Sequence, residues 1–186
     1  MKPDRNTELE WVKGVHAGDE LAFKKMFMAF YPSLCLVAAD IVGSYDIGKE
    51  VAHEVFLNIW ERGTDWQPEG SLKVYLYHAV CKKSINYLKQ DRRRRNAMDR
   101  YTMDLDIRNQ WVDHSADENE LIRKIWDTSR KMPRKRYLIF ILHKRHGLSY
   151  KDIAKSMEIS VKTVENQMGH ALKFLREKLG ANKFSG

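Results

Sequence analysis

The 186-residue chain is long enough for one ordinary domain or for two small helical ones. With 43% apolar and 31% charged residues it is too hydrophobic for general disorder. No stretch reaches the run of about 18 uncharged apolar residues that a membrane helix needs. The first ten residues lack the apolar segment of a signal peptide, and Cys35 and Cys81 form no CxxC pair. These features predict a cytoplasmic protein with no disulfide, metal or cofactor framework.

The net charge of +8 is distributed in blocks along the chain. Lys and Arg balanced against Asp and Glu leave −5 for residues 1–72, +7 for 73–95, −3 for 96–117 and +9 for 118–186. Two basic blocks on either side of an acidic connector favour a protein that contacts nucleic acid in two places. A solvated charged face is the simpler explanation of either block taken alone.

Hydrophobic periodicity is helical and strand signals are nearly absent, so the predicted fold class is all-α. Apolar residues recur at helical spacing from Asp19 to Phe30. Pro32 is expected to interrupt this helix, since proline lacks the backbone N–H, and a second apolar helix is predicted over 34–42.

A third helix is predicted at about 47–62, closed by Gly63. The loop at 64–70 follows, and Ser71 is placed to cap a fourth helix that runs to about Gln90. These four helices make up the first predicted domain.

The stretch from Arg92 to Asp117 has no sustained apolar stripe and is acidic towards its end. This composition predicts a flexible linker. The chain is therefore divided into a helical domain at 1–95, a linker at 96–117 and a second helical domain at 118–186.

The second domain is predicted to begin with helices at about 118–131 and 133–146, the latter stopping at Gly147. Ser149 and Asp152 then resemble a capping box, in which each side chain binds the backbone N–H of the other residue. This box predicts the start of a short helix.

Ser160 is placed to cap a longer helix that runs to about Leu179. One side of this helix is apolar, with Val161, Val164, Met168, Ala171, Leu172 and Leu175. The opposite side carries Lys162, Thr163, Asn166, Gly169, His170 and Lys173. Two helices about a tight turn predict a helix-turn-helix whose polar side reads base edges in a major groove. An ordinary helical hairpin with a solvated face is the alternative.

The helix after Ser71 carries a second polar stripe, made of Tyr75, His78, Lys82, Asn86 and Lys89. Arg92 and Arg93 begin a run of four arginines that extends the stripe. An aromatic residue followed by basic and amide side chains suits single-stranded bases and their phosphates. A surface helix with scattered lysines explains the stripe equally well.

Taken in order, these segments resemble extracytoplasmic-function (ECF) sigma factors, which contain only sigma regions 2 and 4. The front segments are 19–23 (DELAF), 54–60 (EVFLNIW), 75–77 (YLY) and 85–88 (INYL). The rear segments are 132–133 (MP), 147–154 (GLSYKDIA) and 160–164 (SVKTV). The rear motif is similar to that of members from the Bacteroides group.

The resemblance implies a protein that binds core RNA polymerase and directs promoter-specific initiation. It implies polymerase contacts at Glu50, His53, Glu54 and Trp60. It implies contacts to a flipped base of the −10 element at Trp66, Gln67 and Ser71, followed by Tyr75 and Lys82. It implies −35 contacts at Lys162, Thr163, Glu165, Asn166, Gln167 and His170.

The chain departs from the family pattern at three places. Residues 48–53 read GKEVAH where an Ala-Glu-Asp run followed by Gln is usual. Tyr75 replaces the usual Trp, and Lys82 stands where Asn is common. The −10 base preference of the family therefore does not transfer.

The resemblance also implies an anti-sigma factor as a partner, often one anchored in the inner membrane. No catalytic motif, small-molecule substrate or cofactor is expected. His143 and His146 lie three residues apart but are better explained as cations at a helix end than as metal ligands. A free-standing regulator with a helix-turn-helix of the LuxR type, or an RNA-binding helical module, is the alternative function.

Overall fold

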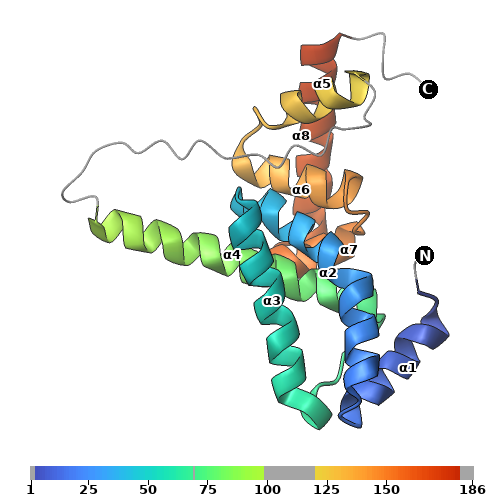
Figure 1. The fold of residues 1–186 in the computed structure, drawn as a ribbon. Coiled ribbons are helices and arrows are strands. Elements are labelled where there is room, and N and C mark those ends of the chain that lie inside the picture. The colour runs from blue at the N-terminus through green and yellow to red at the C-terminus, as the bar shows by residue number, and fades with distance from the viewer. Residues whose placement is uncertain (1–2, 69, 99–119, 181–186) are drawn as a thin grey trace. The chain divides into compact units, whose positions relative to one another are not determined.

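A computed structural model of the chain describes residues 3–68, 70–98 and 120–180. These residues form helices and no strand, which confirms the predicted all-α class. The chain separates into two compact units, residues 1–112 and 113–186. Figure 1 shows the helices of both units in chain order. The predicted linker at 96–117 lies almost wholly outside the described residues.

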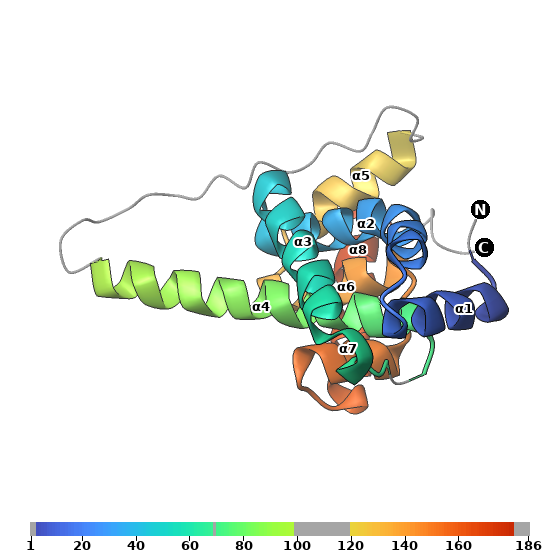
Figure 2. The same cartoon turned by 60° about the horizontal axis from the view of Figure 1, so that its bottom comes forward.

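The front unit contains α1 (Arg5–His16), α2 (Glu20–Val42), α3 (Tyr45–Arg62), a short 3-10 turn and α4 (Leu72–Met98). Helix α2 is central, because it packs against α1, α3 and α4. The second half of α4 projects beyond α2 and α3, as Figures 1 and 2 both show.

Local caps explain where several of these helices start and stop. Ser44 accepts a hydrogen bond from the Ile47 N–H at the start of α3, and Gly63 ends this helix at a positive φ of 47°. Ser71 accepts from the Val74 N–H, 3.2 Å away, as its predicted capping role requires.

Helix α2 is continuous through Pro32, so the predicted break at this residue is wrong. Pro32 and Met28, one turn earlier, are both exposed, and the lost hydrogen bond therefore lies on the solvent side of the helix. The Ser33 hydroxyl donates to the Phe30 carbonyl at 2.9 Å in the same turn of the helix. Buried residues before and after the proline keep both halves of the helix against the same core.

Helix α2 is also long and apolar enough to cross a membrane, judged by length and composition, with a mean hydropathy of 1.5. Lys24, Lys25 and Asp40 interrupt its apolar sequence. Half of its most apolar window is buried inside the protein. Its hydrophobicity is accounted for by its central position in the unit.

Helix α1 is an element that the periodicity did not predict. Asp4 caps it by accepting from the Thr7 N–H at 2.8 Å, and this bond lowers the pKa of the Asp4 carboxyl. Val15 and Glu8 are buried, while the other residues of the helix are half-buried or exposed. Its apolar stripe is too narrow to stand out in the sequence, because so few side chains enter the core.

Helix α4 runs to Met98, beyond the predicted end near Gln90 and into the predicted linker. The four arginines at 92–95 therefore continue a helix rather than begin a loop. Arg93 and Arg94 are exposed on this last stretch of the helix.

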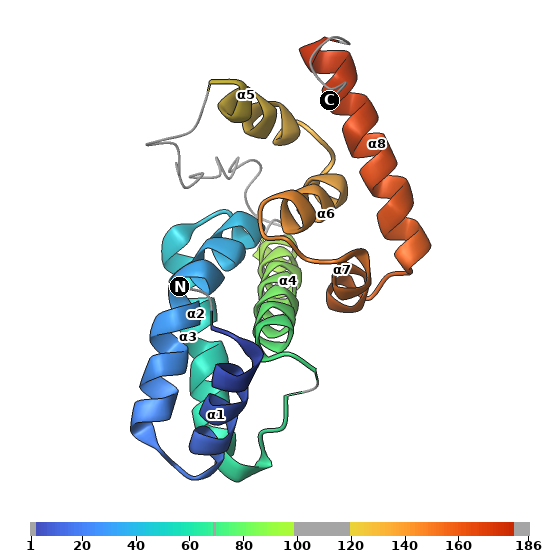
Figure 3. The ribbon, with the colours of Figure 1, turned by 90° about the vertical axis from the view of Figure 1, so that its right-hand side faces the viewer.

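The rear unit contains α5 (Glu120–Ser129), α6 (Arg134–Lys144), α7 (Tyr150–Met157) and α8 (Val161–Leu179). These bounds agree with the four predicted rear helices to within two residues. Helix α8 packs against α5, α6 and α7, and Figure 3 shows it running along the other three. The rings of Trp126 and Phe140 lie 5.7 Å apart and join α5 to α6.

Both cysteines are buried free thiols, as predicted. Burial raises the pKa of Cys81 to about 12 and raises that of Cys35 above its ordinary value. A thiol with a raised pKa stays protonated and is a poor nucleophile.

We expect iodoacetamide at about pH 8, near the ordinary cysteine pKa, to leave both residues unmodified until the protein is denatured. Mass spectrometry checks this, and rapid labelling of the native protein would contradict it.

Candidate nucleic-acid interfaces

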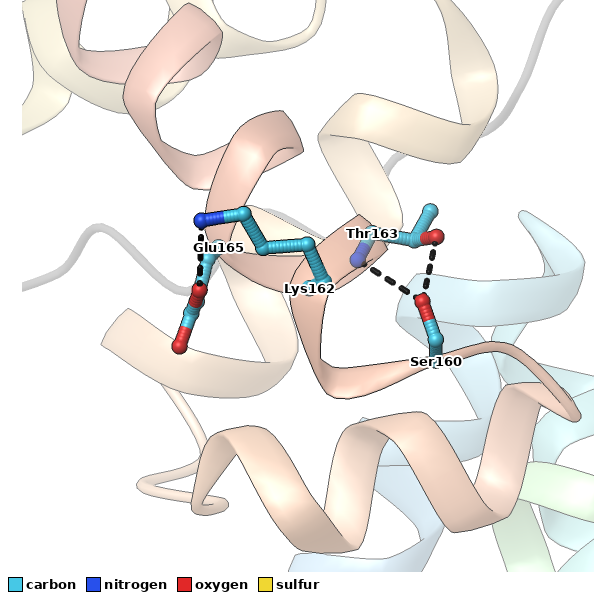
Figure 4. Close-up of polar contacts among 4 residues, drawn as sticks. All are labelled: Ser160, Lys162, Thr163 and Glu165. Atoms are coloured by element: carbon cyan, nitrogen blue, oxygen red, sulfur yellow. Dashed lines mark hydrogen bonds and ion pairs between the residues drawn. The ribbon is translucent and has the colours of Figure 1, made fainter.

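Helices α7 and α8 each begin at a side-chain cap. Ser149 and Asp152 form the predicted capping box, each accepting from the backbone N–H of the other. Glu158 ends α7 in the left-handed region at a φ of 55°, which turns the chain sharply. Ser160 then accepts from the Thr163 N–H at 3.1 Å, and its hydroxyl lies 2.9 Å from that of Thr163 (Figure 4). Two helices packed about a capped turn are a helix-turn-helix.

Helix α8 buries four of the six residues predicted for its apolar side, namely Val164, Met168, Ala171 and Leu175. Val161 and Leu172 were predicted to share that side but are 37% and 43% exposed. Both lie on the same margin of the stripe, because the helix packs on its neighbours along a narrower line than the helical wheel indicates.

The polar side of α8 presents most of the predicted −35 residues to solvent. Exposed members are Lys162, Glu165, Asn166, His170 and Lys173, whereas Thr163 and Gln167 are half-buried. Lys162 lies 3.4 Å from Glu165, so this cation is paired in the free protein (Figure 4). Gln167 accepts from Arg136 of α6 at 3.4 Å and thereby links the helix to its support. Among the described residues, nothing lies within 4 Å of a Cβ built on Gly169, so this face is open.

The polar stripe on α4 lies beside α3 and forms a groove with it. Lys82, Asn86, Lys89 and Arg93 are exposed, and Tyr75 and His78 are half-buried. The groove has a volume of about 350 Å³ and is lined by Tyr75, Lys82 and Asn86 of α4 together with Asn58 and Arg62 of α3. Asn58 and Arg62 were not predicted, because only the packing of α3 on α4 brings them beside the stripe. The predicted contact at Arg92 concerns a side chain outside the described set.

The loop before α4 places its predicted residues on opposite sides of the chain. Gln67 and Ser71 are exposed. Trp66 is 0% exposed and belongs to the core, so the structure does not place its side chain on a DNA-binding surface. Its ring lies edge-on to those of His16 and Tyr75, at 6.2 and 5.8 Å. An aromatic residue in a polar loop does not reveal from sequence alone whether it faces inward.

The four residues predicted to contact polymerase, Glu50, His53, Glu54 and Trp60, are all exposed on α3. They border two different grooves. His53 and Trp60 line an apolar groove of about 590 Å³ against α2, together with the exposed Leu57. Glu50 and Glu54 line a more polar groove against α4, where Glu54 forms an ion pair with Lys83.

No group of three or more metal-ligating side chains occurs within 3–68, 70–98 and 120–180. His143 is hydrogen-bonded through Nδ1 to the Leu148 carbonyl at 2.9 Å. This contact ties the end of α6 to the turn before α7 and gives His143 a structural role.

Comparison with known proteins finds a family that matches the part of the chain containing α7 and most of α8. Residues 122–175 match the family described as sigma-70, region 4. The ECF RNA polymerase sigma-E factor of Haemophilus influenzae is 25% identical over 181 residues, which cover 93% of this chain and 95% of the relative. The chain contains a sigma-70 region 4 and is similar to an ECF sigma factor over nearly its whole length. It is thus an RNA polymerase sigma factor, a transcription initiation factor and not an enzyme.

Solved structures show the same fold. CnrH, in complex with the cytosolic domain of CnrY, has a TM-score of 0.61 at 17% identity. The match covers 95% of the chain described here and 99% of the CnrH chain. RpoE of Bartonella quintana, in complex with the anti-sigma factor NepR, has a TM-score of 0.67 at 15% identity, with coverage of 87% and 98%. The closer similarity to the Bacteroides group is not tested by these comparisons and stays a prediction.

The alternative of a LuxR-type regulator does not agree with the front unit. The usual partner domain of such regulators alternates strands and helices, whereas the part of residues 1–98 that the structure describes contains helices and no strand. An RNA-binding helical module leaves the match to sigma region 4 unexplained.

Proposed function

We propose that the sigma factor binds core RNA polymerase through α3, the −10 element through α4 and its preceding loop, and the −35 element through α8. The observation that carries this assignment is the capped helix-turn-helix, which buries one side of α8 and leaves Lys162, Asn166 and His170 exposed on the other. Asn pairs with adenine and Lys with guanine or phosphate, so this face has the chemistry of duplex readout.

The proposed domain division follows the predicted one, with a −10 and polymerase domain ahead of a connector and a −35 domain from about residue 118. Helix α4 ends at Met98, so the front domain includes at least the three residues beyond 95. The acidic connector itself lies outside the described residues.

On α3 the proposed polymerase surface combines charge with an apolar groove. His53 and Trp60 border the groove of about 590 Å³ against α2, and Glu50 adds negative charge in the separate groove against α4. Glu54 is already paired with Lys83, which reduces the charge it offers to a partner. We therefore assign the larger share of the interaction to Trp60 and His53, since apolar burial is less sensitive to such pairing.

On α4 the proposed −10 site is the groove that Tyr75, Lys82 and Asn86 form with α3. Tyr75 supplies a ring on which a base stacks, and Asn86 supplies donors and an acceptor for its edge. Arg62 at the other wall adds a cation for phosphate. Trp66 is not part of this site, because its side chain is buried.

We also propose an anti-sigma factor as a partner in the cytoplasm. CnrH and RpoE have been seen with CnrY and NepR, respectively, and both share this fold. The exposed apolar residues along the α2–α3 groove, among them Leu21, Leu57 and Trp60, offer a surface for such a protein.

Reconstitution with core RNA polymerase tests the proposed function. Core enzyme with the sigma factor is expected to give discrete transcripts from a genomic library and to protect two DNA elements upstream of each start. The sigma factor alone serves as the control. Binding of duplex DNA by the free protein, with no polymerase-dependent transcript, would contradict the proposal.

The end of α4 carries a prediction about salt. Replacing Arg93 and Arg94 by alanine is expected to weaken holoenzyme binding to promoter DNA and to lower the slope of log K against log salt by about 1.4, because each single-strand phosphate contact contributes about 0.7. Fluorescence anisotropy over a salt series measures this slope. Lys13 and Lys25, both exposed, are replaced together as a charge-matched control. An unchanged slope would show that the two arginines do not contact phosphate.

A further inference from the structure

Helix α1 lies against the loop that leads from α3 into α4. The two segments enclose a cavity of about 220 Å³, lined on one side by Glu8, Val12 and His16 and on the other by loop residues at 67–68 and 70–72. This loop carries Gln67 and Ser71, which belong to the proposed −10 site. The shape of the loop therefore depends on α1, a helix 50 or more residues away in sequence.

Glu8 holds the end of the loop where α4 begins. Its side chain is buried, and its Oε2 accepts a hydrogen bond from the Leu72 N–H at 3.0 Å. The first N–H groups of a helix have no partner within it and carry a partial positive charge. A buried carboxylate at this position is a strong hydrogen-bond acceptor for the Leu72 N–H. Glu10 of the same helix is exposed instead.

His16 holds the start of the same loop. Its Nε2 donates to the Trp66 carbonyl, and its ring lies edge-on to the Trp66 ring at 6.2 Å. Trp66 in turn lies edge-on to Tyr75 at 5.8 Å. A chain of aromatic contacts thus connects α1 to the residue of α4 proposed to stack on a −10 base.

We propose that Glu8 and His16 are positioning residues for −10 recognition, which fix the two ends of the loop and, through Trp66, the ring of Tyr75. The inference rests on the proposed −10 site. Neither residue needs to touch DNA, because each acts on backbone or aromatic groups of the loop. A loop that is already held in its binding shape loses less conformational entropy when the DNA strand binds. We therefore expect loss of this support to weaken −10 base discrimination more than it weakens binding to core polymerase or to the −35 element.

The test uses four variants of the full chain, each assembled with core polymerase. Glu8→Ala removes the acceptor, and Glu8→Gln keeps the volume with a weaker acceptor. His16→Phe keeps a ring against Trp66 without a donor, and His16→Gln keeps an N–H donor. Glu10→Ala is the matched control, because Glu10 is an exposed carboxylate of the same helix.

Binding is measured by anisotropy with a labelled single-stranded oligonucleotide that carries the −10 sequence selected by the wild-type holoenzyme. A second oligonucleotide has one base of that element replaced. Glu8→Ala and His16→Phe are expected to lower the ratio of the two affinities by about tenfold, the size of a lost charge-assisted bond. Glu8→Gln and His16→Gln are expected to recover part of it. Affinity for core enzyme and for −35 duplex is expected to stay at the wild-type value.

Three other results would overturn the proposal. Ratios equal to that of the wild type in all four variants would show that the loop needs no support from α1. A parallel loss of core, −35 and −10 binding, in the conservative variants as well, would show that the two residues serve only stability. A wild-type holoenzyme with no base preference would contradict the proposed −10 site itself, and this failure is recognised without any variant.

Discussion

Replacing Gly48 by alanine is expected to destabilise the front unit by about 3 kcal/mol, the upper range for an overpacked core. A Cβ at this position would lie 2.7 Å from the Ala39 nitrogen and 2.9 Å from the Cys35 carbonyl oxygen. Both atoms belong to the backbone of α2, so no side-chain rotation relieves the clash. Helices α2 and α3 would have to move apart, although alanine favours a helix intrinsically by about 1 kcal/mol over glycine.

Gly169 is the matched control within the same chain. It also lies inside a helix, but a Cβ added there would meet no described atom within 4 Å. Gly169→Ala is therefore expected to stabilise the rear unit by about 1 kcal/mol through helix propensity alone. Hydrogen exchange of peptides from α2 and α3, compared with those from α8, measures each unit separately. Equal stabilisation by both substitutions would contradict the close helix contact at Gly48.

Replacing Asn166 by alanine is expected to remove most of the −35 discrimination of the holoenzyme. A bidentate pair between a side chain and a base contributes about 1–3 kcal/mol, or roughly 5- to 150-fold in affinity. Asn166 is exposed on the polar side of α8, one turn after Lys162. The effect is expected in the ratio of affinities for intact and base-substituted −35 duplexes.

Lys162→Ala and Lys178→Ala separate readout from general charge. Both lysines are on α8, but Lys178 lies in the last turn, away from the capped end. Lys162→Ala is expected to weaken −35 binding, and Lys178→Ala to have little effect. If the two variants weakened binding equally, or if Asn166→Ala left the ratio unchanged, the proposed orientation of α8 on DNA would be wrong.

The rear unit was predictable in detail because its signals act over a few residues. Ser149, Asp152 and Ser160 each bind backbone N–H groups three positions away, and these bonds are present in the structure. The exposed and buried sides of α8 follow from helical periodicity, apart from Val161 and Leu172 at one margin.

The front unit was predictable only in part, and each error has a non-local cause. Pro32 does not break α2, because its lost hydrogen bond lies on the solvent side of a helix that is packed elsewhere. Trp66 was placed at a DNA surface, yet its ring fits between His16 and Tyr75. Its neighbours in the sequence are polar, so nothing local indicated that it faces inward.

By itself, the sequence determined the all-α class, the helix-turn-helix and most residues of its polar side, because caps and periodicity depend on neighbours within one or two helical turns. Only the tertiary structure decided that α1 supports the loop before α4, that Asn58 and Arg62 line the proposed −10 groove, and that Gly48 permits the approach of α2 to α3. Glu8 and Leu72 are 64 residues apart, and His16 and Trp66 are separated by 50. Pairings over such distances depend on how all the helices pack, and no short segment contains that information.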